Sequence, residues 1–329
     1  MTFAIFATDL THTFPSPRGP VQALHGVNLR VEPGQFFGLF GPNGAGKTTL
    51  IRILTTLILP TSGGAQVLGF DVVRQSARVR SVVGLVFSNE NSFYGRLTGR
   101  QNLEFFAALQ NLGRGEARRR AAELFELFDL TAAADAPFQT YSTGMRQKLN
   151  VARALLHNPP VLFLDEPTKG MDVLAAETLR SLLRNELVER QRKTVVLTTH
   201  DLEEMEAMCD QVGILEAGQL RVVGAPADLV REASASVVYR LELVGAANGL
   251  ADHLAALPVV KAVVVASQTR HATVLDVTFA DSHAPEGELW QALLAQNVKI
   301  KRFGPKDDGL ATLLKHSAAS SRNQTVGHG

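Results

Sequence analysis

The chain has very little cysteine: Cys209 is the one thiol among 329 residues. A single thiol excludes an internal disulfide framework and is typical of proteins of a reducing compartment. We therefore expect Cys209 to be a buried packing residue. A reactive thiol is the alternative.

The sequence also lacks an excess of charge of either sign and lacks long apolar runs. Its 33 Lys and Arg residues nearly balance 32 Asp and Glu residues, which gives a net charge of +1. This balance argues against a nucleic acid or an anionic membrane as the main partner. No apolar run of about 18 residues occurs, and the start has no signal-peptide pattern. We expect a chain that neither spans a membrane nor is secreted, and that reaches a membrane only through another protein.

What is present is a composition of 45% hydrophobic and 20% charged residues, typical of a globular chain long enough for two domains. Within residues 1–230, short apolar strands alternate with helical stretches, which predicts an α/β domain. The strands expected there are 36–40, 82–87, 161–164 and 195–199, and the helices include 47–57 and 145–156.

A second, smaller domain is predicted for residues 235–305. Alternating apolar residues predict strands, and leucines at helical spacing predict two helices between them. The resulting order is β-α-β-β-α-β, the ferredoxin-like α+β arrangement. Residues 317–329 lack apolar periodicity and are predicted to form a disordered tail.

A glycine-rich loop, GPNGAGKTT at residues 41–49, matches the pattern G-x-x-x-x-G-K-[ST]. Such a loop curls its backbone N–H groups around phosphates, while Lys47 reaches the phosphate oxygens and Thr48 reaches Mg²⁺. Strand 36–40 leads into the loop and helix 47–57 follows it, so the positive end of the helix dipole also faces the phosphates. The residues predicted to bind a nucleotide here are Gly41, Pro42, Asn43, Gly44, Ala45, Gly46, Lys47, Thr48 and Thr49.

Two carboxylates, Asp165 and Glu166, end the apolar strand in VLFLDEP. Ligands of open α/β sheets bind at the carboxyl ends of the strands. Asp165 is suited to hold Mg²⁺, and Glu166 is suited to orient and deprotonate an attacking water. The alternative is a charged strand end without a catalytic role.

The stretch YSTGMRQKLNVARALL begins with a helix start signal. Ser142 and Gly144 precede apolar positions that repeat at helical spacing, so Ser142 is predicted to be the N-cap. Read alone, this residue caps a helix and does nothing more.

The motifs GPNGAGKTT, YSTGMRQ, LDEP, PTKGMD and VVLTTH, in this order, resemble those of the ATP-binding subunit of an ABC transporter. The resemblance covers about residues 1–230. It implies an ABC-type P-loop NTPase domain with a helical subdomain, followed here by the ferredoxin-like domain. YSTGM is similar to the family's LSGGQ signature, with Thr143 in place of a glycine and Met145 in place of the glutamine.

The resemblance implies that two such domains dimerise head to tail around two ATP molecules, as a homodimer or as a heterodimer with a paralogue. Each phosphate loop then faces the signature of the other subunit. Ser142, Thr143, Gly144 and a helix dipole would supply donors to the γ-phosphate. Asp172 in GMD resembles the loop that communicates across this dimer.

Two further residues acquire roles from the resemblance. His200 ends the strand in VVLTTH and resembles the switch histidine, a catalytic residue that touches the γ-phosphate and polarises the attacking water. Phe14 in THTF lies where the family carries an aromatic that stacks on adenine, and stacking requires only a flat ring. The alternative for Phe14 is an aromatic of the core that happens to be exposed.

The sequence departs from the family after the strand at 82–87. Most members have a glutamine there that reaches Mg²⁺, whereas this chain has Ser88 and Asn89. We favour Asn89 as the metal-side residue, although its carboxamide is one methylene shorter. The cluster Phe93, Tyr94 and Arg96 that follows lies where the family docks a coupling helix of the permease; a loop anchored on its own helical subdomain is the alternative.

The resemblance implies an ATPase that binds ATP and Mg²⁺ and works with a separate multi-span membrane permease, at the cytoplasmic face of the cell membrane. The exact sequences of the motifs and the presence of a small C-terminal domain resemble the ATPases of the daunorubicin-resistance and nodulation-type exporters. This resemblance implies export of a drug, lipid or similar compound. The alternative is a soluble ABC-type ATPase that acts on ribosomes or DNA. One cassette and a net charge of +1 disfavour it, so no nucleic acid partner is expected.

Overall fold

The computed structural model divides into two units, Met1–Val223 and Gly224–Gly329. It describes residues 3–17, 19–87, 92–199, 201–229, 238–245, 249–279, 287–296 and 298–305. Each unit is described by itself. The predicted tail at 317–329 lies outside the described residues.

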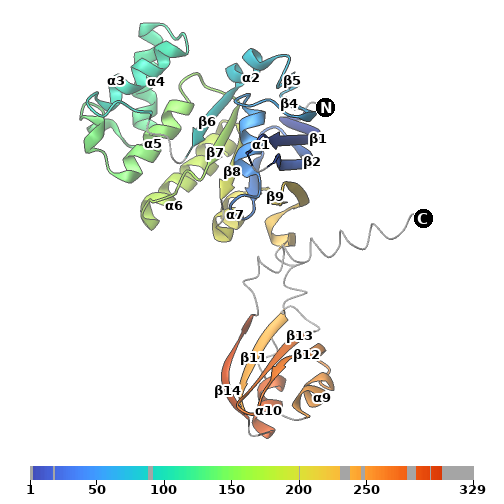
Figure 1. Cartoon of the computed structure of the whole chain (residues 1–329). Coiled ribbons are helices and arrows are strands. Elements are labelled where there is room, and N and C mark those ends of the chain that lie inside the picture. Colours follow the sequence, from blue (N-terminus) through green and yellow to red (C-terminus); the bar gives the residue numbers. More distant parts are fainter. Residues whose placement is uncertain are drawn as a thin grey trace. The chain divides into compact units, whose positions relative to one another are not determined.

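Two sheets form the body of the first unit (Figure 1). The smaller sheet has the order β2-β1-β4-β5 and consists of antiparallel strands β1 (Ile5–Phe14), β2 (Val21–Val31), β4 (Ser62–Val67) and β5 (Phe70–Asp71). The larger sheet has the order β10-β9-β3-β8-β7-β6 and consists of β3 (Phe36–Phe40), β6 (Val83–Phe87), β7 (Val161–Asp165), β8 (Thr194–Thr199), β9 (Gln211–Glu216) and β10 (Gln219–Gly224).

The central strands β3, β7 and β8 are buried at every position. Strands covered on both faces read as continuous apolar runs, which is why their sequences do not alternate. They pair in parallel, so that Phe40 lies opposite Thr199 and Asp165 lies opposite Thr198. The carboxyl ends of all three strands therefore meet at one edge of the sheet.

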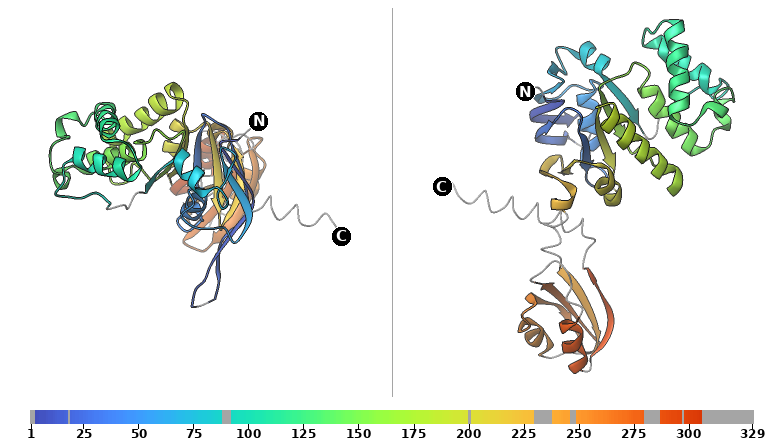
Figure 2. Two further views of the ribbon diagram at one scale, coloured as in Figure 1. Left: turned by 90° about the horizontal axis from the view of Figure 1, so that it is seen from above. Right: turned by 180° about the vertical axis from the view of Figure 1, so that it is seen from behind.

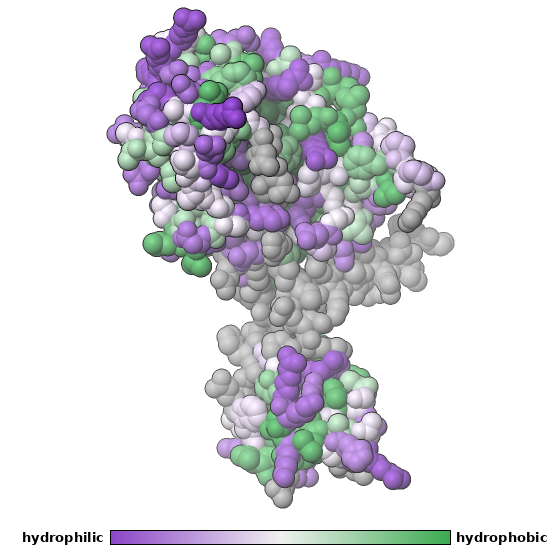
Figure 3. Space-filling model, turned by 60° about the vertical axis from the view of Figure 1, so that its left-hand side comes forward, coloured by the Kyte–Doolittle hydropathy of each residue, from purple (hydrophilic) through white to green (hydrophobic). Residues whose placement is uncertain are grey.

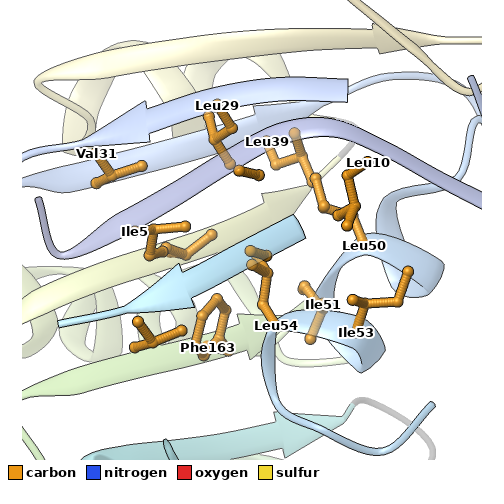
Figure 4. Packing of buried hydrophobic residues seen from close by; sticks show 14 of the residues in the cluster. Ile5, Leu10, Leu29, Val31, Leu39, Leu50, Ile51, Ile53, Leu54 and Phe163 are labelled. Atoms are coloured by element: carbon orange, nitrogen blue, oxygen red, sulfur yellow. The ribbon is translucent and has the colours of Figure 1, made fainter. Parts of the chain in front are cut away.

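Helix α1 (Lys47–Leu54) packs its apolar side chains between the two sheets. Figure 4 shows Leu50, Ile51 and Leu54 among side chains from β1, β2 and β3. The helix ends earlier than the predicted residue 57, because Thr56 adopts a positive φ of 63°. Because α1 is held in this core, the position of Lys47, its first residue, is fixed, and so is the end of the glycine loop.

Other helices of this unit are α2 (Ser76–Val82), α6 (Val173–Ser181), which continues as a π-helix over Leu182–Arg190, and α7 (Leu202–Met208). Cys209 follows α7, is buried, and lies 3.7 Å from the Met205 sulfur. Burial raises the pKa of its thiol. Its expected role as a packing residue agrees with this setting.

A helical subdomain, α3 (Gly99–Leu109), α4 (Arg114–Leu127) and α5 (Thr143–Ala154), lies to one side of the sheets in all views (Figures 1 and 2). Thr98 caps α3 in a capping box with Gln101. Short 3₁₀ turns at Thr131–Ala133 and Phe138–Thr140 lead to α5. Tyr141 anchors this connection, since its hydroxyl donates to the Ala133 carbonyl at 2.7 Å, and burial raises the pKa of Tyr141 to about 12.

The second unit contains β11 (Val238–Val244), α9 (Leu250–Ala255), β12 (Val260–Gln268), β13 (Ala272–Phe279), α10 (Glu288–Ala295) and β14 (Lys299–Pro305). Its antiparallel sheet has the order β12-β13-β11-β14, which confirms the ferredoxin-like prediction. Leucines from both helices and both central strands form its core, among them Leu241, Leu254, Leu275 and Leu293.

Within the described part of the chain, none of the helices combines the length and the apolar character that a membrane crossing requires. On the face shown in Figure 3, polar and apolar residues are interspersed on each unit.

Candidate nucleotide-binding site

The glycine loop between β3 and α1 borders a cavity of about 490 Å³ at the carboxyl edge of the large sheet. Of the residues predicted to bind a nucleotide, those that line this cavity are Asn43, Gly44, Ala45, Gly46, Lys47, Thr48, Thr49, Asp165 and Glu166. The first turn of α1 leaves backbone N–H groups without carbonyl partners of the helix, so this wall is suited to bind anions.

Two glycines of the loop, Gly41 and Gly46, allow its backbone to pass close to backbone carbonyls of other segments. At Gly46, φ is 106°, and a Cβ atom would lie 2.7 Å from the Ala23 carbonyl oxygen. At Gly41, a Cβ atom would lie 2.1 Å from the Leu215 carbonyl oxygen. A side chain at either position would force the loop away from these backbone groups, so the phosphate-binding path requires glycine.

Lys47 lies in the cavity wall with only 7% of its surface exposed. Its ammonium donates hydrogen bonds to the Gly41 carbonyl and, at 3.1 Å, to the Pro42 carbonyl. Burial lowers the pKa of Lys47, while the nearby charges of Glu166 and Asp165 act in the opposite direction. Gly41 and Pro42 thus support the lysine rather than line the cavity.

Asp165 ends β7 and is 9% exposed. One carboxylate oxygen accepts a hydrogen bond from the hydroxyl of Thr48 at 3.3 Å, and the other accepts one from the hydroxyl of Thr198. Thr48 and Asp165 together present a hydroxyl and a carboxylate, the hard oxygen donors that suit Mg²⁺. Among the described residues, no group of three or more His, Cys, Asp or Glu could form a protein-only metal site. A magnesium ion shared with bound phosphates requires only one or two protein ligands.

Glu166 follows directly and adopts a left-handed backbone with φ of 49°. Its amide donates to the Thr198 carbonyl at 3.0 Å. Such backbone conformations are uncommon for residues other than glycine, and they gather at functional sites. The turn places Glu166 in the lining of the cavity that the glycine loop borders.

Predicted signature residues lie elsewhere on the surface of the unit. Ser142 is the N-cap of α5 and accepts a hydrogen bond from the Met145 amide at 3.2 Å. Ser142 and Thr143 are exposed, and Gly144 packs near Ala175 at the start of α6. These residues do not line the cavity of their own chain.

Two more predicted residues also lie outside the cavity lining. Asp172 is the exposed N-cap of α6 and accepts from the Ala175 amide at 2.9 Å. Phe14 is half-buried, with the His12 ring edge-on at 4.3 Å between centroids. The remaining predictions, His200 and Asn89 with its neighbour Ser88, lie outside the described residues.

The cluster Phe93, Tyr94 and Arg96 was interpreted either as a docking site for the permease or as a loop anchored on its own helical subdomain. Phe93 packs into the helical subdomain against Phe106 and Phe138, with the Arg153 guanidinium above its ring. The loop is thus anchored on its own subdomain through Phe93 and through an edge-on contact of Tyr94 with Phe105. Tyr94 and Arg96 nevertheless remain exposed.

Three residues at or near the site were not singled out from the sequence. Thr198 is a buried hydroxyl near the carboxyl end of β8, a position that could have indicated a partner for Asp165. Lys169 lines the cavity and pairs with Glu166. Glu204 on α7 is 2% exposed, and its position in a run of acidic residues contained no signal of burial.

Glu204 joins α7 to the segment that follows β7. Its carboxylate accepts hydrogen bonds from the Thr168 hydroxyl at 2.8 Å and from the Arg180 guanidinium at 3.2 Å. Thr168 lies two residues after Glu166, and Arg180 belongs to α6. The buried carboxylate of Glu204 thereby connects α7, the segment after β7, and α6.

The fold and the cavity define a P-loop nucleotide-binding protein, and the comparisons specify its class. The family model described as ABC transporter matches residues 24–169. The chain is 36% identical to the ABC transporter ATP-binding protein NatA of Bacillus subtilis, over 67% of this chain and 89% of that protein. It is 42% identical to the daunorubicin resistance ATP-binding protein DrrA3 of Streptomyces coeruleorubidus, over 65% of this chain and 67% of that protein.

Among solved structures, a dimeric ATP-binding cassette in a post-hydrolysis state bound to ADP and Pi is similar with a TM-score of 0.62. It is 28% identical and is matched over 68% of this chain and 98% of its own length. This chain belongs to the ABC transporter ATP-binding family. It is an ATP-hydrolysing cassette, and the resemblance inferred from its motifs is confirmed.

Replacing Glu204 by alanine tests the buried connection. We expect Glu204→Ala to lower the free energy of unfolding of the first unit by about 3 kcal/mol, because it leaves Arg180 and Thr168 without their buried partner. Chemical denaturation followed by circular dichroism measures this. Glu123→Ala is the matched control, since Glu123 pairs with Arg119 and Arg120 at the surface, and it should cost less than about 1 kcal/mol. Equal costs for both variants would contradict the assignment.

Proposed function

We propose that this chain is the ATP-hydrolysing motor subunit of an exporter whose pore is a separate membrane permease. The observation that carries the proposal is the similarity to a daunorubicin resistance ATP-binding protein, combined with the cavity at the glycine loop, which is lined by Lys47, Thr48, Asp165 and Glu166. We call this cavity the phosphate cavity. The cargo class that this implies is a drug, lipid or similar compound.

In the proposed reaction, the loop amides and Lys47 bind the phosphates of ATP. Thr48 and Asp165 would hold Mg²⁺, which offsets phosphate charge when bound. Glu166 accepts a proton from the attacking water, whose oxygen bonds to the γ-phosphorus as the bond to the bridging oxygen of ADP breaks. The products are ADP and inorganic phosphate.

Three residues complete the proposed site. His200 would polarise the attacking water, and Asn89 would reach the metal side of the nucleotide. Phe14, which is half-buried, would stack on adenine. These roles are proposed from the family's motifs.

We also propose that ATP closes a dimer of two cassettes, either identical or paralogous. Ser142, Thr143 and Gly144 lie at the start of α5, away from their own phosphate cavity, and Asp172 lies beside them at the start of α6. Exposed donors at a helix N-terminus are suited to bind the γ-phosphate of a nucleotide held by a second subunit. The free energy of closure would move the permease between two states.

A groove of about 640 Å³ is the proposed seat of the permease. It lies where β6 and α2 face the ends of α3 and α5, and its rim includes the exposed leucines Leu57 and Leu109. The exposed Tyr94 and Arg96 belong to the loop that leads into α3. Its lining combines apolar and polar residues, so it is suited to receive a short amphipathic helix of a partner. Docking there would hold the chain at the cytoplasmic face of the membrane.

The base is tested by Glu166→Gln. We expect this variant to lower the ATPase rate by about 10²–10⁴-fold while ATP binding is retained, because the amide cannot accept the proton of water. Phosphate release measures turnover, and a fluorescent ATP analogue measures binding. Near-wild-type hydrolysis would remove Glu166 as the base.

The cross-subunit role is tested by Ser142→Ala, made together with Glu166→Gln so that ATP persists. We expect ATP-dependent dimerisation to fall at least tenfold while ATP binding to the monomer changes less than twofold. Analytical ultracentrifugation with and without ATP measures the dimer. Thr98→Ala, which removes the cap of α3, is the control for loss of a helix cap. Equal losses of dimerisation and of ATP binding to the monomer would contradict the role of Ser142 across the dimer interface.

The partner is tested by affinity purification of tagged Glu166→Gln protein, with ATP, from gently solubilised native cells. We expect a multi-span membrane protein to co-purify, and to be lost when Leu57 and Leu109 are both replaced by aspartate. Ribosomal proteins or DNA-bound factors without a membrane protein would favour the alternative, an ABC-type ATPase that acts on ribosomes or DNA.

A further inference from the structure

The turn after β7 contains an ion pair, between Glu166 and Lys169, that the proposed reaction does not use. The ammonium of Lys169 lies 2.7 Å from a carboxylate oxygen of Glu166. The backbone amide of Lys169 also donates to the Glu166 carbonyl, at 3.2 Å. Lys169 therefore binds Glu166 twice, once to close the turn and once to hold the carboxylate.

This pair belongs to the phosphate cavity. Lys169 lines it together with Lys47, Asp165 and Glu166, so two lysines and two carboxylates face the space where phosphates bind. The hydrogen bond to Glu166 and the charge of Glu166 raise the pKa of Lys169. The Lys169 side chain is 54% exposed, whereas that of Glu166 is 14% exposed.

An ion pair with one partner this exposed contributes little to stability. Its effect is on the geometry of the carboxylate. A glutamate side chain has three rotatable bonds, and a general base must lie within hydrogen-bond reach of the water that it deprotonates. The Glu166 backbone is already fixed by its bond to Thr198, so an anchor at the tip of the side chain restricts the bonds between the two fixed ends.

We propose that Lys169 is a positioning residue for ATP hydrolysis: its ammonium holds the Glu166 carboxylate at the cavity wall, in the orientation from which it acts on water. The proposal rests on the proposed role of Glu166 as base. Lys169 acts through Glu166 and leaves binding of the phosphates to Lys47 and the loop.

Steady-state kinetics of Lys169→Met separate this role from phosphate binding. We expect kcat to fall about tenfold, a part of the roughly 10²–10⁴-fold that a general base contributes, while KM and the Kd of a fluorescent ATP analogue change less than twofold. Lys169→Arg keeps a cationic donor and should recover most of kcat. Lys261→Met, at an exposed position of the second unit, controls for loss of a lysine charge.

Three results for Lys169→Met would overturn the proposal. An unchanged kcat would show that Glu166 needs no anchor. A raised kcat would show that the ion pair restrains the base. A higher KM with kcat unchanged would show that Lys169 binds the nucleotide directly.

A double-mutant cycle with Glu166→Gln tests whether Lys169 acts through Glu166. In the Glu166→Gln background, we expect Lys169→Met to change the single-turnover rate less than twofold. A tenfold effect that persists there would overturn the proposal. A near-wild-type rate of Glu166→Gln alone would instead remove the base and the proposal with it, so the two failures give different results.

Discussion

Parallel pairing of β3, β8 and β7 is the constraint on which the site depends. β3 leads into the glycine loop, β7 ends in Asp165, and β8 supplies the Thr198 hydroxyl that binds this carboxylate. Because the three strands are in register, the lysine of the loop and the two carboxylates border one cavity although they are more than a hundred residues apart in sequence. The apolar contacts of α1 between the two sheets then hold the loop against this edge.

In a single chain, the residues of the phosphate cavity and the signature residues lie at different places on the first unit. The residues proposed to bind the phosphates and the metal lie within one unit, around the cavity. Ser142 and Thr143 are exposed at the start of α5, where the first turn of a helix has N–H groups without carbonyl partners in the helix. In the proposed dimer, a second subunit would provide these donors, and ATP hydrolysis would then be linked to a change of assembly.

The sequence predicted the parts of this site that depend on local chemistry. The glycine loop, the carboxylates at the end of an apolar strand and the Ser142 cap each follow from residue types at fixed spacing, and the ferredoxin-like order followed from apolar periodicity. It did not predict Glu204 or the pairing of Lys169 with Glu166. Burial of Glu204 depends on Thr168 and Arg180, and neither contact follows from helical spacing. The end of α1 was also missed, because no glycine or proline marks the left-handed Thr56.

Register between β3 and β8 joins Phe36 to Val195, residues about 160 positions apart. During synthesis at roughly 5–20 residues per second, the ribosome needs on the order of ten seconds to add the later strand after the earlier one. Throughout this time β3, a strand with every position apolar or glycine, has no neighbour within its final sheet. The β1–β2 hairpin, which is contiguous in sequence and already synthesised, is the available cover. The order of the elements along the chain thus gives β3 apolar side chains to pack against before its partner strands in the sheet are synthesised.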